Sequence, residues 1–207
     1  TYLPRCPEVA ARSYAKKADL PFQPVFYKMR GERSFQGSNA DERKESIGQN
    51  LHLLPGMAQK IKGKTVILLD DSIVRGNNSK RARDLLYEEA GVEKAYLVSY
   101  TPPIGIIGDD GVPRGCTFGV DMPPDPPPGD EFIARNRTVT EVGQAMKMPV
   151  VYLSMEGMLK AFERAGLPER DLCTFCIGGR MPYEGAESLI QIGEKPQMDL
   201  LAGLKAG

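Results

Sequence analysis

The feature that most constrains the fold is a short apolar run at residues 66–69, Val-Ile-Leu-Leu, which ends directly in two aspartates. An unbroken apolar run of this length is typical of a strand buried on both faces, as in a parallel sheet. Residues 79–90 have the periodicity of an amphipathic helix that stops before Gly91, and residues 95–98 are apolar again. Strand, helix and strand with short connections predict a right-handed βαβ unit, so the fold class is α/β.

Weaker periodicities predict further elements on both sides of this unit. They are a helix at 8–18, strands at 24–28 and 150–153, and helices at 138–148 and 155–165. In the first of these helices, Val9, Ala10 and Tyr14 are the expected buried stripe. Between Gly105 and Asp130 no regular element is predicted, because six glycines and six prolines occupy that stretch. A loop of this length is usually functional or held by something other than a core.

Composition excludes several classes of protein. Lys+Arg and Asp+Glu both number 27, so the charge gives no reason to propose a nucleic acid or an anionic membrane as partner. No apolar stretch reaches the length of a membrane span, and no signal-peptide pattern begins the chain. The single histidine, His52, argues against a Ser-His-Asp site or a multi-histidine metal site. Four cysteines are too few for a disulfide scaffold, which indicates a thiol-reducing cytoplasm.

The strongest chemical signal is the stretch from the apolar run to the start of the helix. In open α/β sheets, ligands bind outside the carboxyl ends of the strands, where Asp70 and Asp71 lie. The backbone N–H groups of residues 73–78 and the helix N-terminus can hold a phosphate. The two carboxylates can accept ribose hydroxyls or hold Mg²⁺. The alternative interpretation is an acid pair and a capped helix without any ligand.

Three cysteines form a second pattern. Cys173 and Cys176 have the C-x-x-C spacing, and Cys116 lies in the long Gly/Pro-rich loop. In a cytoplasmic protein this combination favours a metal over a disulfide. An iron–sulfur cluster, a zinc ion and three unligated buried thiols all remain open on spacing alone.

Several stretches together resemble one family. Asp70-Asp-Ser-Ile-Val-Arg-Gly76 resembles the phosphoribosylpyrophosphate-binding motif of type I phosphoribosyltransferases, in the form found in the amidophosphoribosyltransferase family. Separate blocks agree in the same order: Thr101-Pro-Pro-Ile104, Cys116-Thr-Phe-Gly-Val-Asp121, Asn136-Arg-Thr-Val139, Tyr152-Leu-Ser-Met-Glu-Gly157 and Leu172-Cys-Thr-Phe-Cys176. The resemblance covers most of residues 1–183.

The resemblance implies a fold and a place in a longer protein. Residues 1–135 are expected to form a type I phosphoribosyltransferase domain with a mostly parallel sheet, incomplete at its N-terminus. Residues 136–207 are expected to form a helical C-terminal segment that carries the cysteine pair. The chain is then the C-terminal portion of an enzyme whose glutaminase domain would precede Thr1.

The resemblance also implies an activity and its partners. Ammonia from glutamine would be transferred to phosphoribosylpyrophosphate to give 5-phosphoribosylamine, the first step of de novo purine nucleotide synthesis in the cytoplasm. Purine nucleotides would be feedback inhibitors, and the protein would be a homo-oligomer with no nucleic-acid or membrane partner. The alternatives are a non-catalytic module that senses nucleotides or phosphoribosylpyrophosphate, and a nucleobase phosphoribosyltransferase, although such enzymes lack these cysteine blocks.

Site residues carried over from the family fall into three groups. Lys28, Arg30 and Arg33 resemble the start of a loop that closes over the substrate, and are expected to be catalytic. The substrate-binding set is Asp70, Asp71, Ser72, Ile73, Val74, Arg75, Gly76, Asn77, Asn78 and Ser79, with Asp70 and Asp71 also holding Mg²⁺. Cys116, Cys173 and Cys176 resemble three ligands of a [4Fe–4S] cluster whose fourth ligand would lie upstream.

Two segments depart from the family pattern. Leu3-Pro-Arg-Cys-Pro-Glu8 stands where the family has a V-P-D-[TS] loop that contacts metal and pyrophosphate. Gly76-Asn77-Asn78 stands where the family usually has G-T-T, so that two hydroxyl donors become amide donors.

Overall fold

A three-stranded parallel sheet lies at the centre of the molecule. The structure, a computed structural model, describes residues 1–29, 50–116, 118 and 122–181. The strands follow the order β3 (Thr65–Asp70), β4 (Lys94–Ser99) and β5 (Val150–Tyr152). Leu68 lies opposite Leu97 in the first pair, and Leu97 lies opposite Val150 in the second. The predicted α/β class and its parallel sheet are therefore confirmed.

Residues 1–3 extend this sheet by running parallel to the free edge of β3. The Leu3 N–H donates to the Leu69 carbonyl at 2.8 Å, and the Leu69 N–H donates to the Thr1 carbonyl at 3.1 Å. The chain segment that follows Leu3 therefore leaves the sheet at the same end as the residues that follow β3. The sequence does not predict this pairing, because three residues are too few to show a periodicity.

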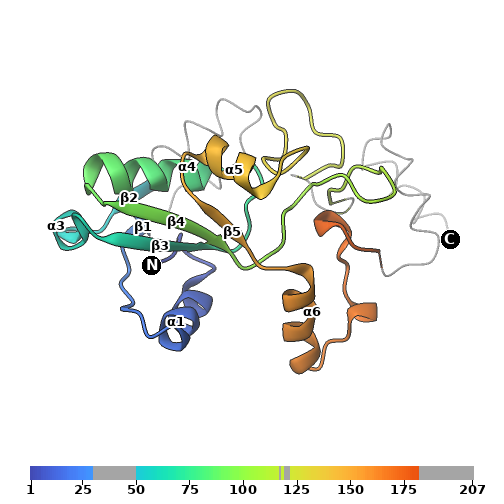
Figure 1. Cartoon of the computed structure of the whole chain (residues 1–207), viewed down its shortest axis with the longest axis horizontal. Coiled ribbons are helices and arrows are strands. Elements are labelled where there is room, and N and C mark those ends of the chain that lie inside the picture. Colours follow the sequence, from blue (N-terminus) through green and yellow to red (C-terminus); the bar gives the residue numbers. More distant parts are fainter. Residues whose placement is uncertain (30–49, 117, 119–121, 182–207) are drawn as a thin grey trace.

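Helices cover the two faces of the sheet unequally (Figure 1). On one face lie α4 (Asn77–Asp84), which continues as the π-helical turn Leu85–Glu89, and α5 (Val139–Met146). On the other face lies α1 (Glu8–Lys17). The β3–α4–β4 order is the predicted βαβ unit.

The remaining elements surround this centre. Strands β1 (Phe26–Lys28) and β2 (Leu51–Leu53) form an antiparallel pair, followed by α3 (Met57–Ile61). After β5 come α6 (Met155–Arg164) and the short 3₁₀ turns Glu169–Asp171 and Phe175–Ile177. Among the helices in the described part of the chain, none is long and apolar enough to cross a membrane.

The sheet has one fully packed face and one partly open face. Leu68, Ala95 and Leu97 are completely buried and belong to the core that also holds residues of α4 and α5. On the α1 side a groove of about 520 Å³ remains, and Val151 is 50% exposed there. The expectation that the strand at residues 66–69 is buried on both faces is confirmed in part. On the groove side Leu69 is 4% exposed, whereas Ile67 is half-buried, because α1 covers only part of this face.

Helix α1 also packs differently from the prediction. Its buried residues are Ala11 and Ala15, whereas Val9 is 80% exposed and Tyr14 lines the groove. Alanine methyl groups let the helix approach its neighbours closely, and this packing selects the small residues rather than the larger ones. Helix α5 begins with a capping box, in which the Glu141 N–H donates to Thr138 Oγ1 at 3.3 Å and the Thr138 N–H donates to the Glu141 carboxylate at 2.7 Å.

The Gly/Pro-rich loop is held by side chains. Between residues 105 and 130 the described positions contain no helix or strand, only the isolated bridge between Ile107 and Pro113. The Arg135 guanidinium donates to the carbonyl oxygens of Gly105, Pro124 and Arg114. A small apolar cluster links the loop to the C-terminal part of the chain, and it contains Ile104, Phe132, Met158 and Ile177. The division into domains at residue 135 stays a prediction, and β5, which lies beyond it, pairs with β4.

Candidate functional site

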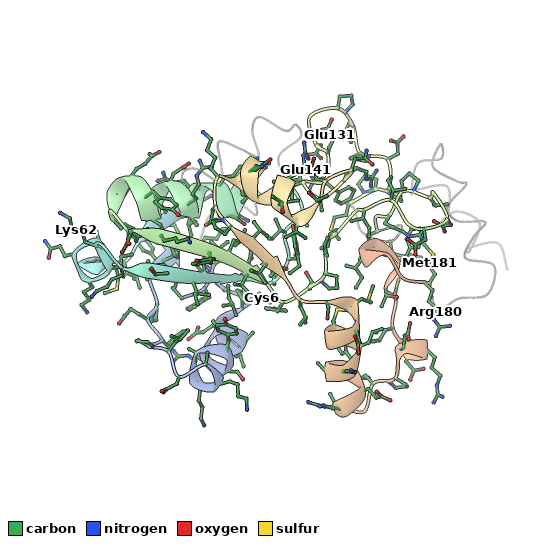
Figure 2. All side chains as sticks on the ribbon, viewed as in Figure 1. Cys6, Lys62, Glu131, Glu141, Arg180 and Met181 are labelled. Atoms are coloured by element: carbon green, nitrogen blue, oxygen red, sulfur yellow. The ribbon has the colours of Figure 1, made fainter. Side chains whose placement is uncertain are left out.

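The carboxyl ends of three parallel segments meet at one edge of the sheet. Residues 1–3 lead into Arg5 and Cys6, β3 leads into Asp70 and Asp71, and β4 leads into Tyr100. Figure 2 shows Cys6 at the end of the sheet where these strands finish. The Cys6 Sγ lies 3.6 Å from the Tyr100 hydroxyl, so the first and third segments are in contact. This is the edge at which open α/β sheets bind ligands.

The two aspartates have different surroundings. Asp70 is buried, and its carboxylate accepts hydrogen bonds from the Ser79 hydroxyl at 3.0 Å and from the Asp71 N–H at 2.9 Å. Burial, followed by the nearby negative charge of Asp71, raises the pKa of Asp70 well above its usual range. Asp71 is half-buried, and its Oδ1 accepts from the Ser72 N–H at 2.8 Å. A cation or hydroxyl donors placed at this pair would relieve the repulsion between the carboxylates.

The loop after the aspartates has the geometry of a phosphate-binding turn. Gly76 adopts φ 77°, and a Cβ atom built there would lie 2.7 Å from the Met146 Sδ. Glycine therefore meets both the backbone conformation and the close approach of α5. Helix α4 begins at Asn77, and the N–H groups of its first turn have no acceptor within the helix. These donors and the positive end of the helix dipole favour an anion.

Two residues of the predicted substrate-binding set have other contacts. The Ile73 side chain is buried, so that only its backbone can reach a ligand. The Arg75 guanidinium donates to the Asp130 carboxylate at 2.7 Å and to the Asp130 carbonyl oxygen at 3.1 Å. The Ile133 N–H also donates to the Val74 carbonyl at 2.8 Å. These contacts attach the phosphate-type turn to the end of the long loop.

Two cationic side chains lie near the acid pair. Lys28, at the end of β1, is half-buried, and its pKa is lowered by burial and by the neighbouring charge of Arg5, while Asp70 opposes this shift. Lys28 is therefore within electrostatic reach of both Arg5 and Asp70. The other two predicted catalytic residues, Arg30 and Arg33, lie outside the described residues. The structure adds two residues to the site. Arg5 belongs to the segment that departs from the family's V-P-D-[TS] loop, and Tyr100 has no signal in the sequence.

The three cysteines of the second pattern gather in one region without forming a metal site. The Cys176 thiol has a pKa raised to about 11 by burial first, and then by the nearby charges of Cys116 and Cys173. Within the described residues, however, no three His, Cys, Asp or Glu side chains are close enough to hold a metal ion. Three thiols are the donor set that iron–sulfur clusters and zinc use, so their chemistry fits such a group although their present spacing does not.

Comparison with known proteins adds sequence relatives. No protein-family model matches the chain. The chain is 31% identical over 175 residues to an amidophosphoribosyltransferase of Archaeoglobus fulgidus, covering 84% of this chain and 35% of the relative. It is 32% identical over 176 residues to the amidophosphoribosyltransferase of Methanocaldococcus jannaschii, and the match covers 84% of this chain and 33% of the relative. It is 30% identical over 179 residues to the amidophosphoribosyltransferase of Bacillus subtilis, and the match covers 84% of this chain and 34% of the relative.

A solved structure agrees with these relatives. It is described as the allosteric regulatory enzyme of purine biosynthesis, and it matches with a TM-score of 0.66 and 27% sequence identity. The match covers 95% of this chain and 40% of the solved one, so the two share their fold over nearly all of the present sequence. The chain spans about a third of the length of the three sequence relatives.

Proposed function

We propose, from the premise that this chain resembles amidophosphoribosyltransferases over 84% of its length, that it binds phosphoribosylpyrophosphate and transfers ammonia to it. The observation that carries the proposal is the acid pair at the end of β3, followed directly by the Gly76 turn and the N-terminus of α4. Carboxylates for a ribose and backbone donors for a phosphate are then next to each other along a single turn of the chain. The same edge of the sheet carries cations for a second anionic group.

Each part of the substrate has candidate partners. The 5′-phosphate would accept hydrogen bonds from the N–H groups of residues 72–78. The ribose hydroxyls would donate to Asp70 and Asp71. The diphosphate would lie toward Lys28 and toward Arg30 and Arg33, which are outside the described residues. The acid pair would also hold Mg²⁺, whose chemistry at such a site is to offset the charge of the diphosphate leaving group.

The reaction needs no protein nucleophile. The C1–O bond of the substrate breaks and its electron pair leaves with diphosphate, while the nitrogen lone pair of ammonia forms the C1–N bond. The ammonium so formed loses one proton to give 5-phosphoribosylamine. Since positive charge develops at C1, the work of the chain is to fix the sugar and to stabilise the departing diphosphate. Exclusion of water protects C1 from hydrolysis.

The whole protein would do more than this chain alone. We propose that its ammonia comes from glutamine, through a glutaminase domain of the kind that the relatives' greater length allows. The product would enter purine nucleotide synthesis in the cytoplasm. Purine nucleotides would act as feedback inhibitors of a homo-oligomer.

The cysteines support a separate proposal about a structural cofactor. Cys116, Cys173 and Cys176 would hold three corners of a [4Fe–4S] cluster, with zinc as the alternative. The charges of Cys116 and Cys173 both act on the pKa of the Cys176 thiol, which supports the assignment of the three cysteines to one group. A cluster would bind the long loop to the C-terminal turn and would play no part in the transfer.

The proposed activity is tested by binding and turnover of the purified protein. Calorimetry in the presence of Mg²⁺ should detect phosphoribosylpyrophosphate, and the double variant Asp70→Asn, Asp71→Asn should lose at least tenfold in affinity. Two charge-assisted contacts would be removed, each worth about 1.5 kcal/mol or more. Release of inorganic diphosphate with ammonium as donor measures turnover.

The controls separate binding from folding. Far-ultraviolet circular dichroism and the unfolding midpoint should show that the double variant still folds. The same affinity in the variant and the wild type would contradict the proposal. Tight binding without diphosphate release, also in the full-length protein, would instead support the sensing module.

A further inference from the structure

We propose that Arg75 and Asp130 form a positioning pair, which fixes the turn at residues 74–76 so that its backbone N–H groups converge on the 5′-phosphate of the substrate. The inference rests on the proposed function, because it assigns how that same site is held ready for its ligand. The family resemblance implies that Arg75 binds the substrate itself. The structure assigns it another role, in which Arg75 acts on the phosphate through the backbone of the turn.

The ion pair between Arg75 and Asp130 is two-pronged. The Arg75 Nε lies 2.7 Å from one carboxylate oxygen of Asp130, and Nη2 donates to the other oxygen at 2.7 Å. The Nε also donates to the Asp130 carbonyl oxygen at 3.1 Å. The two side chains are only 14% and 9% exposed, so water and salt screen the pair little. A guanidinium held at both oxygens of one carboxylate has a fixed orientation, and its donors are directed at Asp130.

The residues on both sides of Arg75 contact the same segment of the chain. The Val74 carbonyl accepts a hydrogen bond from the Ile133 N–H at 2.8 Å. A Cβ atom built on Gly76 would lie 3.1 Å from the Ile133 Cδ1, and Ile133 is buried. Three successive residues, 74–76, are therefore held by residues 130–133, at the end of the Gly/Pro-rich loop.

A fixed turn matters because the expected phosphate donors are backbone groups. Such donors bind one anion together only while they point at one place, and a glycine such as Gly76 leaves the backbone more freedom than other residues do. A turn that is ordered before the ligand arrives avoids the entropy loss of ordering during binding. Loss of the pair should therefore weaken binding although no contact with the ligand is removed.

The burial of the pair argues against a direct contact between Arg75 and the phosphate. To reach a ligand with its charged end, Arg75 would have to release Asp130. That would leave a buried carboxylate without its cation, which is strongly unfavourable. The intact pair with a ligand on the backbone donors avoids this cost.

The test is a double-variant cycle in the full-length protein. Calorimetry in the presence of Mg²⁺ measures the affinity for ribose 5-phosphate and for phosphoribosylpyrophosphate. The proteins are the wild type, Arg75→Gln, Asp130→Asn and the double variant. Arg114→Gln is the matched control, because Arg114 is a buried arginine of the same loop that pairs with Asp110 at 2.9 Å. Each single variant of the pair should bind both ligands about tenfold more weakly, and the control should stay within twofold.

The double variant separates positioning from contact. If the pair positions the turn, either single variant already releases it, so the double variant should also lose about tenfold rather than about a hundredfold. If Arg75 instead contacts the phosphate, Asp130→Asn should bind as tightly as the wild type or more tightly, because the guanidinium is released toward the ligand. Either that result or additive losses overturns the inference.

Hydrogen exchange follows the turn itself. The Ile133 amide proton is bonded to the Val74 carbonyl, so its exchange rate reports whether the turn is in place. Without ligand, this proton should exchange at least tenfold faster in Arg75→Gln than in the wild type. Saturating ribose 5-phosphate should slow its exchange in the wild type, because order in the turn and binding are reciprocally coupled. Exchange that neither the variant nor the ligand changes contradicts a positioning role.

Far-ultraviolet circular dichroism checks that each variant folds. If Arg75→Gln does not fold, Arg75→Lys takes its place in the cycle, since lysine keeps the charge and loses the fork, and the expected loss is then about threefold. If the wild type binds neither ligand, the proposed function fails and the inference falls with it. If the wild type binds both and the variants of the pair bind them equally well, only the inference fails.

Discussion

Gly76 meets two separate demands on a single residue. Its φ of 77° lies in the left-handed region, and a Cβ there would lie 2.7 Å from Met146 Sδ and 3.1 Å from Ile133 Cδ1. Met146 is completely buried, so its side chain has little room to move away. The turn that presents backbone donors to a phosphate therefore depends on glycine for the backbone conformation and for the packing of α5 against it.

Comparing Gly76→Ala with the same substitution at a second glycine should separate the effect of backbone strain from that of overpacking. Gly63→Ala is the matched control, since Gly63 has φ 66° and nothing lies within 4 Å of the position that an added methyl group would take. We expect Gly63→Ala to lower the free energy of unfolding by about 1 kcal/mol, from backbone strain alone. Gly76→Ala should cost about 2–4 kcal/mol, because overpacking adds to the strain. Urea unfolding measures both, and equal losses would show that Met146 adjusts freely.

At the level of elements, the two faces of the sheet make a testable contrast. Leu97 of β4 is 0% exposed and packs under α4 and α5, whereas Val151 of β5 is 50% exposed on the α1 side. Leu97→Ala should lower the free energy of unfolding by about 2–5 kcal/mol, since it leaves a cavity in a closed core. Val151→Ala should change it by less than about 1 kcal/mol. Denaturant unfolding compares the two, and a large loss for Val151→Ala would mean that this face is covered.

The same elements illustrate what the sequence could predict. The βαβ unit follows from the apolar run, the helical periodicity and Gly91, because its signals are local and agree with one another. The predicted stripe on α1 is wrong, because hydrophobicity favours Val9 and Tyr14 while close packing selects Ala11 and Ala15. The coverage of the second sheet face depends on which element lies over it, and periodicity carries no such information.

The candidate site likewise has a part that the sequence predicts and a part that it does not predict. Asp70, Asp71 and Gly76 are close together in sequence, so the motif itself predicts their proximity. The approach of Arg5 to Lys28 depends on a three-residue parallel pairing and on the antiparallel pair of β1 and β2. Such convergence is a property of the tertiary fold, and short segments give no signal of it.

At the scale of the whole molecule, the cysteines test whether a cofactor joins distant regions. Anaerobically purified full-length protein should contain iron and acid-labile sulfide in equal amounts, and Cys173→Ser should lose both together with part of its stability. A cluster would cross-link the loop at Cys116 to the C-terminal turn and restrict the unfolded chain. Cys6→Ser is the matched control and should keep its iron, since Cys6 lies at the strand ends beside Tyr100.

Metal analysis together with sulfide determination gives the outcome. Stoichiometric zinc without sulfide would replace the cluster with a zinc site. Protein that contains neither metal would leave the three thiols as packing residues.

The contacts of Arg135 determine how the long loop opens. One guanidinium binds three carbonyl oxygens that are spread from Gly105 to Pro124, and it also stacks on the Phe132 ring at 4.9 Å. A ladder of backbone hydrogen bonds can fray from one end, whereas three contacts made by one guanidinium are lost together when that side chain moves away. Amide protons along this loop should therefore exchange with solvent at one common rate, as a cooperative unit, rather than along a gradient from its tip to its base.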